Sequence, residues 1–262
     1  MTIRQPDPDL QAFVTAELNQ PTLAEATAFA ASLGAKPGVA AVLFYGSCLQ
    51  RGTTEGMLDF YALTDSILPY GQNRISAAAN RILPPNVYPE NFQALKAKVA
   101  VVPFDVFHQR MSLRSWDTTF WARFCQRTAI VWARDDAARA AAAQAVTTGV
   151  ETAAIWAERL TPGTGGVAAW RGLFAKTYKV EIRVERPGRA ADIVGADEDR
   201  FAELWPLTGD ARAKAPPASS FGWTFRWLWG KPLHVSRLLK AAFTFEGGPQ
   251  YLLWKIRRHR RR

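Results

Sequence analysis

The sequence predicts a mixed α/β protein, and three features of the chain support this class. The runs 42–45 and 57–63 are short, apolar and aromatic, as buried strands are. Between and after them lie longer segments with helical character, among them the alanine-rich segment 135–146. The chain has 262 residues and is 48% hydrophobic, which is enough for one large domain or two modest ones.

Proline and glycine residues set most of the expected boundaries. Pro21 opens the second of two helices in 7–33, and Pro84 and Pro85 close a short helix that spans 73–82. Pro103 lies within an apolar run and indicates an edge strand or a bulge. The remaining predicted elements are a strand over 98–107, a helix with an aromatic face over 116–132, and a helix over 135–146.

A glycine-rich break at 161–166 separates a helix that ends near residue 160 from one that spans 167 to about 186. The segment 212–220 is rich in proline and serine and reads as a linker. The expected organisation has three parts. They are a catalytic domain at 1–146, a helical domain at 147–220, for which a winged-helix type is one alternative, and a C-terminal segment at 221–262.

The strand at 42–45 runs into Gly46 and Ser47, and the strand at 57–63 carries Asp59 among apolar residues. A carboxylate on a buried strand needs a cation or a metal ion as partner, because an unpaired buried charge is costly. Gly46 lets backbone N–H groups approach a phosphate, Ser47 adds a hydroxyl donor, and Asp59 could hold Mg²⁺ against that phosphate. The alternative is structural, since a Gly-Ser turn and a strand-end aspartate are common without any function.

The order of strand, Gly-Ser turn, loop and aspartate on a neighbouring strand resembles the layout of the polymerase-β-like nucleotidyltransferases. Most of that superfamily has a second carboxylate two residues after the first, where this chain has Tyr61. The segments 44–47, 57–60 and 98–102, followed by Trp116, resemble more narrowly the mitochondrial-type phosphatidate cytidylyltransferases. These are membrane-associated CDP-diacylglycerol synthases without spanning helices.

That resemblance implies transfer of CMP from CTP to phosphatidic acid with Mg²⁺, and it assigns roles to several residues. Asp59 and Asp105 would bind the metal and, with Lys98, form the catalytic group. The residues expected to bind the nucleotide are Tyr45, Gly46, Ser47, Lys176, Glu181 and Arg183. The chain departs from the family pattern at Cys48, Arg127 and Glu181, where the family has glycine, lysine and aspartate.

Composition excludes several other classes. Two cysteines and three widely separated histidines give neither a disulfide framework nor a histidine-based metal site. No apolar run reaches the ~18 residues of a membrane-spanning helix, and the N-terminus lacks the basic and apolar regions of a signal peptide. We therefore expect a peripheral protein on the cytoplasmic face of the membrane.

The positive charge is concentrated at the C-terminus. Residues 226–262 hold ten Lys and Arg against one acid, a balance of +9, so 1–225 carry only +1 of the total of +10. Nucleic-acid binding would spread basic residues over the catalytic half, so we expect no nucleic-acid partner. The segment 221–229 has five aromatic residues, and aromatic residues beside cations suit an anionic membrane surface. The expected lipid contacts are Arg237, Lys240, Tyr251, Trp254, Lys255, Arg257 and Arg258.

Two alternatives to the lipid-directed enzyme remain open at this stage. One is a nucleotidyltransferase that acts on tRNA or a small molecule. The other is a nucleotidyltransferase fold that has lost catalysis and serves as a membrane-surface binding module, which Tyr61 at the position of the second carboxylate favours. The aromatic cluster and basic end could also be a packed core cluster followed by a disordered terminus.

Overall fold

A computed structural model describes residues 7–65, 68–180, 189–217 and 220–244. Its centre is a five-stranded mixed sheet with strand order β3-β4-β2-β1-β5. The strands are β1 (Val39–Tyr45), β2 (Met57–Thr64), β3 (Asn86–Phe92), β4 (Leu95–Pro103) and β5 (Thr128–Ala133). β2 and β4 run parallel, and the other neighbours are antiparallel. The mixed α/β class is confirmed.

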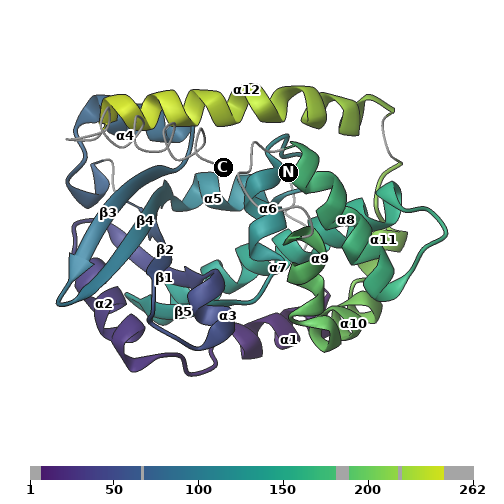
Figure 1. The fold of residues 1–262 in the computed structure, drawn as a ribbon, viewed down its shortest axis with the longest axis horizontal. Coiled ribbons are helices and arrows are strands. Elements are labelled where there is room, and N and C mark those ends of the chain that lie inside the picture. Colours follow the sequence, from purple (N-terminus) through teal and green to yellow (C-terminus); the bar gives the residue numbers. More distant parts are fainter. Residues whose placement is uncertain (1–6, 66–67, 181–188, 218–219, 245–262) are drawn as a thin grey trace.

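The two faces of the sheet carry different apolar clusters, because side chains alternate along each strand. One face packs on α2 (Ala24–Gly34) through residues such as Phe44 and Phe60. The other face, which includes Leu43 and Tyr61, packs on most of the remaining helices. Helices therefore cover both faces of the sheet (Figure 1). The larger apolar cluster lies on the face that includes Tyr61.

The helices around this core follow the chain in order. Asp7 caps α1 (Pro8–Leu18), and Asn73 caps α4 (Arg74–Ile82) through its side chain, as expected for these residue types. The others are α3 (Ser47–Arg51), α5 (Phe104–Met111), α6 (Thr118–Phe124), α7 (Asp136–Leu160), α8 (Gly166–Val180), α9 (Arg189–Gly195), α10 (Glu198–Leu207), α11 (Gly209–Ala213) and α12 (Ser220–Thr244). A 3₁₀ turn, η1, spans Pro69–Gly71.

Two expectations about the middle of the chain were wrong. The strand expected over 98–107 ends at Pro103, where α5 begins, so Asp105 lies on a helix. The helix expected over 116–132 is divided into α6 and β5, because Asp117 caps a short helix and the apolar run 128–133 pairs with β1. Strand pairing overrides the helical preference of this segment.

The expected domain boundary between residues 146 and 147 falls inside α7, a single helix of 25 residues. One apolar cluster extends from Leu10 and Leu43 through Val146 to Phe201, so it includes residues from both sides of that boundary. The linker expected over 212–220 begins in α11. The segment around 161–166 does separate α7 from α8, as the glycines predict.

α12 is a long helix that lies across one side of the molecule, from α8 and α11 at one end to α4 at the other (Figure 1). Its inner side contacts α8 and β3, and Gly230 lies against Val180. Among the helices of the described residues, none is long and apolar enough to cross a membrane.

Candidate functional site

The strand register places three of the expected site residues in one row across the sheet. Asp59 of β2 is the direct neighbour of Tyr45 on β1 and of Lys98 on β4. Paired residues on adjacent strands project from the same face, with Cβ atoms about 5 Å apart. The row therefore places a half-buried carboxylate between an aromatic ring and a cation.

Gly46 follows this row directly and brings the backbone against the carboxylate. Glycine adopts its φ of +87° without strain, whereas other residues rarely do. A Cβ at this position would lie 3.0 Å from Oδ2 of Asp59, which is closer than an ordinary contact. The left-handed backbone turns the chain from β1 into α3, where Ser47 is the first residue. Tyr45, Gly46, Ser47 and Asp59, which the sequence predicted as one site, are therefore brought together.

Arg123 is a further member of this group, which sequence reasoning missed. It lies in the last turn of α6, and its Nη1 donates a 2.8 Å hydrogen bond to Oη of Tyr61. Its guanidinium carbon lies 5.5 Å from the ring centre of Tyr45. The signal in the sequence was a cation within the aromatic run 120–124, since a buried-strand carboxylate requires a positive partner.

Two opposing effects act on the pKa of the Asp59 carboxyl group. Burial raises the pKa of its carboxyl group above the ordinary value, while the positive charges of Lys98 and Arg123 act to lower it. The net result is a raised pKa, so the two cations only partly compensate for the lost solvation. An added divalent cation would favour the ionised form of Asp59 further.

The carboxylate expected to complete the metal site lies elsewhere. Asp105 belongs to the first turn of α5 and forms an exposed ion pair with Arg81. Lys98, the neighbour of Asp59, lies five strand residues before Pro103, so Asp105 is roughly 15 Å or more from the row. Asp105 therefore does not share a metal site with Asp59, because it follows the opposite end of β4.

The described residues contain no cluster of three or more His, Cys, Asp or Glu side chains that could hold a metal ion alone. Mg²⁺ sites in nucleotide enzymes often use only one or two carboxylates, with the remaining ligands from substrate phosphates and water. Asp59 beside Gly46 fits that kind of incomplete site, because the carboxylate faces a turn at which phosphates can be held.

Three expected nucleotide-binding residues come from the second half of the chain. Lys176 is exposed on α8, a helix that packs chiefly on α7 and α9 rather than on the sheet. Glu181 and Arg183 lie outside the described residues. The structure therefore gives these three residues no contact with the row of Lys98, Asp59 and Tyr45 within the described part of the chain.

Two of the expected lipid contacts face the protein instead. Arg237 forms an ion pair with buried Asp117, and its Nε donates a 2.7 Å hydrogen bond to the carbonyl of Pro84. Lys240 donates to the carbonyl groups of Leu83 and Pro85. Both cations thus join α12 to the body of the protein. Their assignment to the membrane was wrong, and Tyr251, Trp254, Lys255, Arg257 and Arg258 lie outside the described residues.

Asp117 and Lys240 have shifted pKa values. Burial acts against ionisation of Asp117, but attraction and hydrogen bonds from Arg237 outweigh it and hold the carboxyl pKa below its usual value. Burial, with some repulsion from Arg237, lowers the pKa of Lys240 to about 7. The inner side of α12 is therefore a polar contact that depends on charge.

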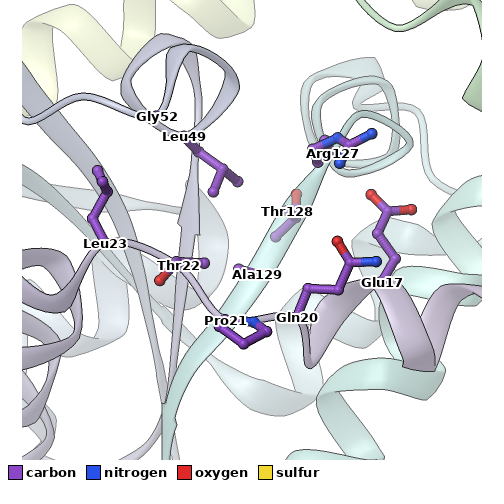
Figure 2. Close-up of a pocket in the computed structure, with 10 residues that line it drawn as sticks. All are labelled: Glu17, Gln20, Pro21, Thr22, Leu23, Leu49, Gly52, Arg127, Thr128 and Ala129. Carbon is purple, nitrogen blue, oxygen red and sulfur yellow. The ribbon is translucent and has the colours of Figure 1, made fainter.

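A pocket is lined by residues of α1, α3 and the edge strand β5 (Figure 2). Its volume is about 260 Å³, and it includes Thr128, the strand neighbour of Tyr45. Arg127 at its rim forms two hydrogen bonds to Asp197, of 2.8 and 3.1 Å. The residues that line it are Glu17, Gln20, Pro21, Thr22, Leu23, Leu49, Gly52, Arg127, Thr128 and Ala129.

Comparison with known proteins finds a likeness to several solved structures. The chain is similar to the solved structure of a nucleotidyltransferase-like protein from Exiguobacterium sibiricum, with 11% identity and a TM-score of 0.30. The match covers 91% of this chain and 80% of that one. No protein-family model and no curated protein matches the sequence. A likeness at this level carries no argument about activity, which rests on the residues around Asp59.

Proposed function

We propose that this protein is a nucleotidyltransferase that transfers CMP from CTP to phosphatidic acid, with CDP-diacylglycerol and pyrophosphate as products. The observation that carries the proposal is the row of Lys98, Asp59 and Tyr45 with Gly46 against the carboxylate. A backbone turn, one carboxylate and nearby cations are the groups that such a transfer needs. The motif resemblance supplies the identity of the two substrates.

In the reaction, an oxygen of the lipid phosphate attacks the α-phosphorus of CTP. A new P–O bond forms, the bond between the α-phosphorus and the bridging oxygen breaks, and pyrophosphate leaves with that electron pair. The attacking oxygen is already ionised near neutral pH, so no strong general base is required. This suits a site with a single carboxylate among the described residues of the row.

Each residue of the site has a proposed task. The backbone at Gly46 and the hydroxyl of Ser47 bind the triphosphate, and Lys98 and Arg123 stabilise the negative charge that develops during transfer. Asp59 would hold Mg²⁺, which when bound supplies charge neutralisation for the phosphates. The pocket that includes Thr128, the strand neighbour of Tyr45, offers room for the nucleoside (Figure 2).

The test is a direct transfer assay. Purified protein is incubated with radiolabelled CTP, Mg²⁺ and phosphatidic acid in mixed micelles, and label is measured in the chloroform phase. The proposal predicts a labelled lipid product and release of pyrophosphate. Label in RNA or in a water-soluble acceptor would support the alternative nucleotidyltransferase, and absence of any CTP binding would contradict the proposal.

The matched pair of variants is Asp59→Asn and Asp105→Asn. We expect Asp59→Asn to lower kcat/KM by roughly 10²-fold or more, as the loss of a charge-stabilising group does. Asp105→Asn removes the same charge from an exposed ion pair far from the row, so its activity should remain that of the unmodified protein. Equal losses in the two variants would contradict the assignment of the site to Asp59.

A further inference from the structure

α12 has an unusual distribution of side chains. Its cations Arg226 and Arg237 point toward the body, where Arg226 is buried and donates hydrogen bonds to the carbonyls of Leu113 and Ser115. Surface helices normally bury their apolar side and expose their charges. Here the buried side is held by polar contacts, and large apolar residues occupy the solvent side.

The solvent side, which we call the outer face, consists of large apolar residues that are between 39% and 59% exposed. They are Phe225, Trp227, Leu228, Trp229 and Val235. Trp116, from the loop before α6, extends this surface, since its ring centre lies 4.6 Å from that of Phe225. Phe225 also stacks on Trp229 at 6.1 Å, so the exposed rings contact one another instead of folding inward.

We propose that the outer face of α12 docks the protein onto an anionic lipid bilayer, with the helix lying in the plane of the interface. Tryptophan and phenylalanine are the side chains that the headgroup region selects, and an amphipathic helix binds there through its apolar side. This inference stands on the surface of α12 and not on the reaction proposed above.

Charge favours a lipid surface over another protein as the occupant. Residues 220–244 contain no Asp or Glu, and Lys231 lies on the outer side with its Nζ 5.8 Å from the ring centre of Trp227. The segment 245–262 that follows directly contains six Lys and Arg against one acid. Apolar contact and attraction to anionic lipid therefore act at the same end of the chain.

Docking through this face would also fix the orientation of the candidate site. Arg237, on the inner side of α12, lies over Phe120, and Phe120 packs against Tyr61. Tyr61 in turn accepts the hydrogen bond from Arg123. A short series of direct contacts thus joins the bilayer-facing helix to the residues around Asp59, so the site would be held at a constant position relative to the lipid.

The experiment compares vesicle binding of the full chain with that of the variant Trp227→Gln, Leu228→Gln, Trp229→Gln. All three side chains are about half exposed, so the variant should fold normally. Vesicles contain phosphatidylcholine with phosphatidylglycerol, which keeps binding separate from turnover. We expect at least tenfold weaker binding for the triple variant. The matched control is Met57→Gln, an exposed apolar residue of β2 outside α12, which should bind as the unmodified chain does.

A second measurement locates the helix in the membrane. Leu228→Cys carries a spin label, since the two native cysteines are buried. Contact with vesicles should bring the label to the depth of the headgroups. A label that stays in water, equal binding by the triple variant, or a dimer in solution that the triple variant dissociates would each overturn the proposal, the last by showing a protein interface.

Failure of the docking proposal can be distinguished from failure of the proposed reaction. Transfer of CMP to a short-chain, water-dispersed phosphatidic acid does not require docking. If the triple variant keeps this activity but loses activity on vesicles, the outer face serves membrane docking. If vesicle binding by the outer face is absent while the short-chain lipid is still used, the docking proposal fails and the proposed function stands.

Discussion

Nη1 of Arg123 and Oη of Tyr61 are 2.8 Å apart and join α6 to the strand that carries Asp59. Tyr61 projects from the same face of β2 as Asp59, two residues further along. The strand that carries Asp59 thus also holds an arginine close to that carboxylate. The site around Asp59 therefore combines one carboxylate with two fixed cations, Lys98 and Arg123.

The first prediction tests this hydrogen bond. Tyr61→Phe removes only the acceptor for Arg123, so the ring keeps its packing against Phe124, 4.9 Å away. We expect kcat/KM to fall about tenfold, because a hydrogen bond to a charged group contributes roughly 1.5 kcal/mol or more. Steady-state kinetics should place the loss mainly in kcat if Arg123 acts on the developing charge.

The matched control is Tyr70→Phe. The Tyr70 hydroxyl also makes a hydrogen bond to a charged side chain, that of Glu90 at 2.9 Å, but it belongs to the opposite face of the sheet. A comparable loss of stability with unchanged activity is expected for this variant. If both variants lose activity in parallel with stability, the Tyr61 hydroxyl has a structural role alone.

A second prediction concerns stability and pH at Asp59. Burial raises the pKa of this carboxyl group in the folded state, so the folded protein binds its proton more tightly than the unfolded chain does. Ionisation at neutral pH therefore destabilises the fold. Asp59→Asn should have a larger free energy of unfolding than the unmodified protein at neutral pH, and this gain should shrink as pH falls through the folded pKa toward 3.8.

Asp135 serves as the comparison, because its pKa is shifted in the opposite direction. Hydrogen bonds from the first turn of α7, together with Arg134, lower its pKa, so its charge stabilises the fold above pH 3.8 and this contribution is lost as pH falls. Asp135→Asn should therefore lose stability at neutral pH. Urea unfolding at several pH values measures both variants. A loss of stability in Asp59→Asn at neutral pH would show that Lys98 and Arg123 outweigh burial.

The sequence was sufficient to predict the strands that build the site. β1 and β2 are short apolar runs with clear ends, and Gly46 marks a turn that only glycine adopts easily, so local chemistry determined them. β5 was missed because its run, Thr128–Ala133, is apolar enough for either state and becomes a strand only by pairing with β1. Pairing across the chain is not visible in local periodicity.

The contacts of α12 could not be predicted for a related reason. Aromatic residues at every second position between 221 and 229 lie about 200° apart on a helix, so the spacing alone does not show which of them face the body and which face solvent. Trp223 turns toward Trp156, while Trp227 and Trp229 remain exposed. Arg237 was assigned to the membrane because of its charge alone. Its partner, buried Asp117, is 120 residues away in sequence, so local sequence could not reveal this ion pair.

The third prediction tests how α12 is held. Asp117 is almost fully buried, so Arg237→Met leaves an unpaired charge in the interior, which typically costs about 3–5 kcal/mol. We expect this variant to have a much lower free energy of unfolding and faster protease cleavage within α12. The double variant Asp117→Asn, Arg237→Met should recover part of the loss, because no isolated charge remains. Additive losses in the double variant would contradict direct coupling of the two residues.

The last prediction separates the basic segment from the outer face of α12. Truncation after Gly248 removes the six Lys and Arg of 249–262 but leaves α12 and its exposed aromatic residues. Each cation near an anionic surface contributes about 1 kcal/mol, and salt screens this attraction but not apolar burial. The truncated chain should bind anionic vesicles more weakly, and its remaining binding should depend little on salt concentration.

The control for this truncation is the full-length chain with all six cations replaced by Gln, which keeps Tyr251 and Trp254. Co-sedimentation at low and high salt should give the same loss of salt dependence in the two proteins, while CTP binding remains unchanged in both. Stronger residual binding by the substituted chain would assign part of the affinity to those two aromatic residues. Binding of the truncated chain equal to that of the unmodified protein at low salt would show that the basic segment contributes nothing, and the outer face of α12 would then carry the attachment alone.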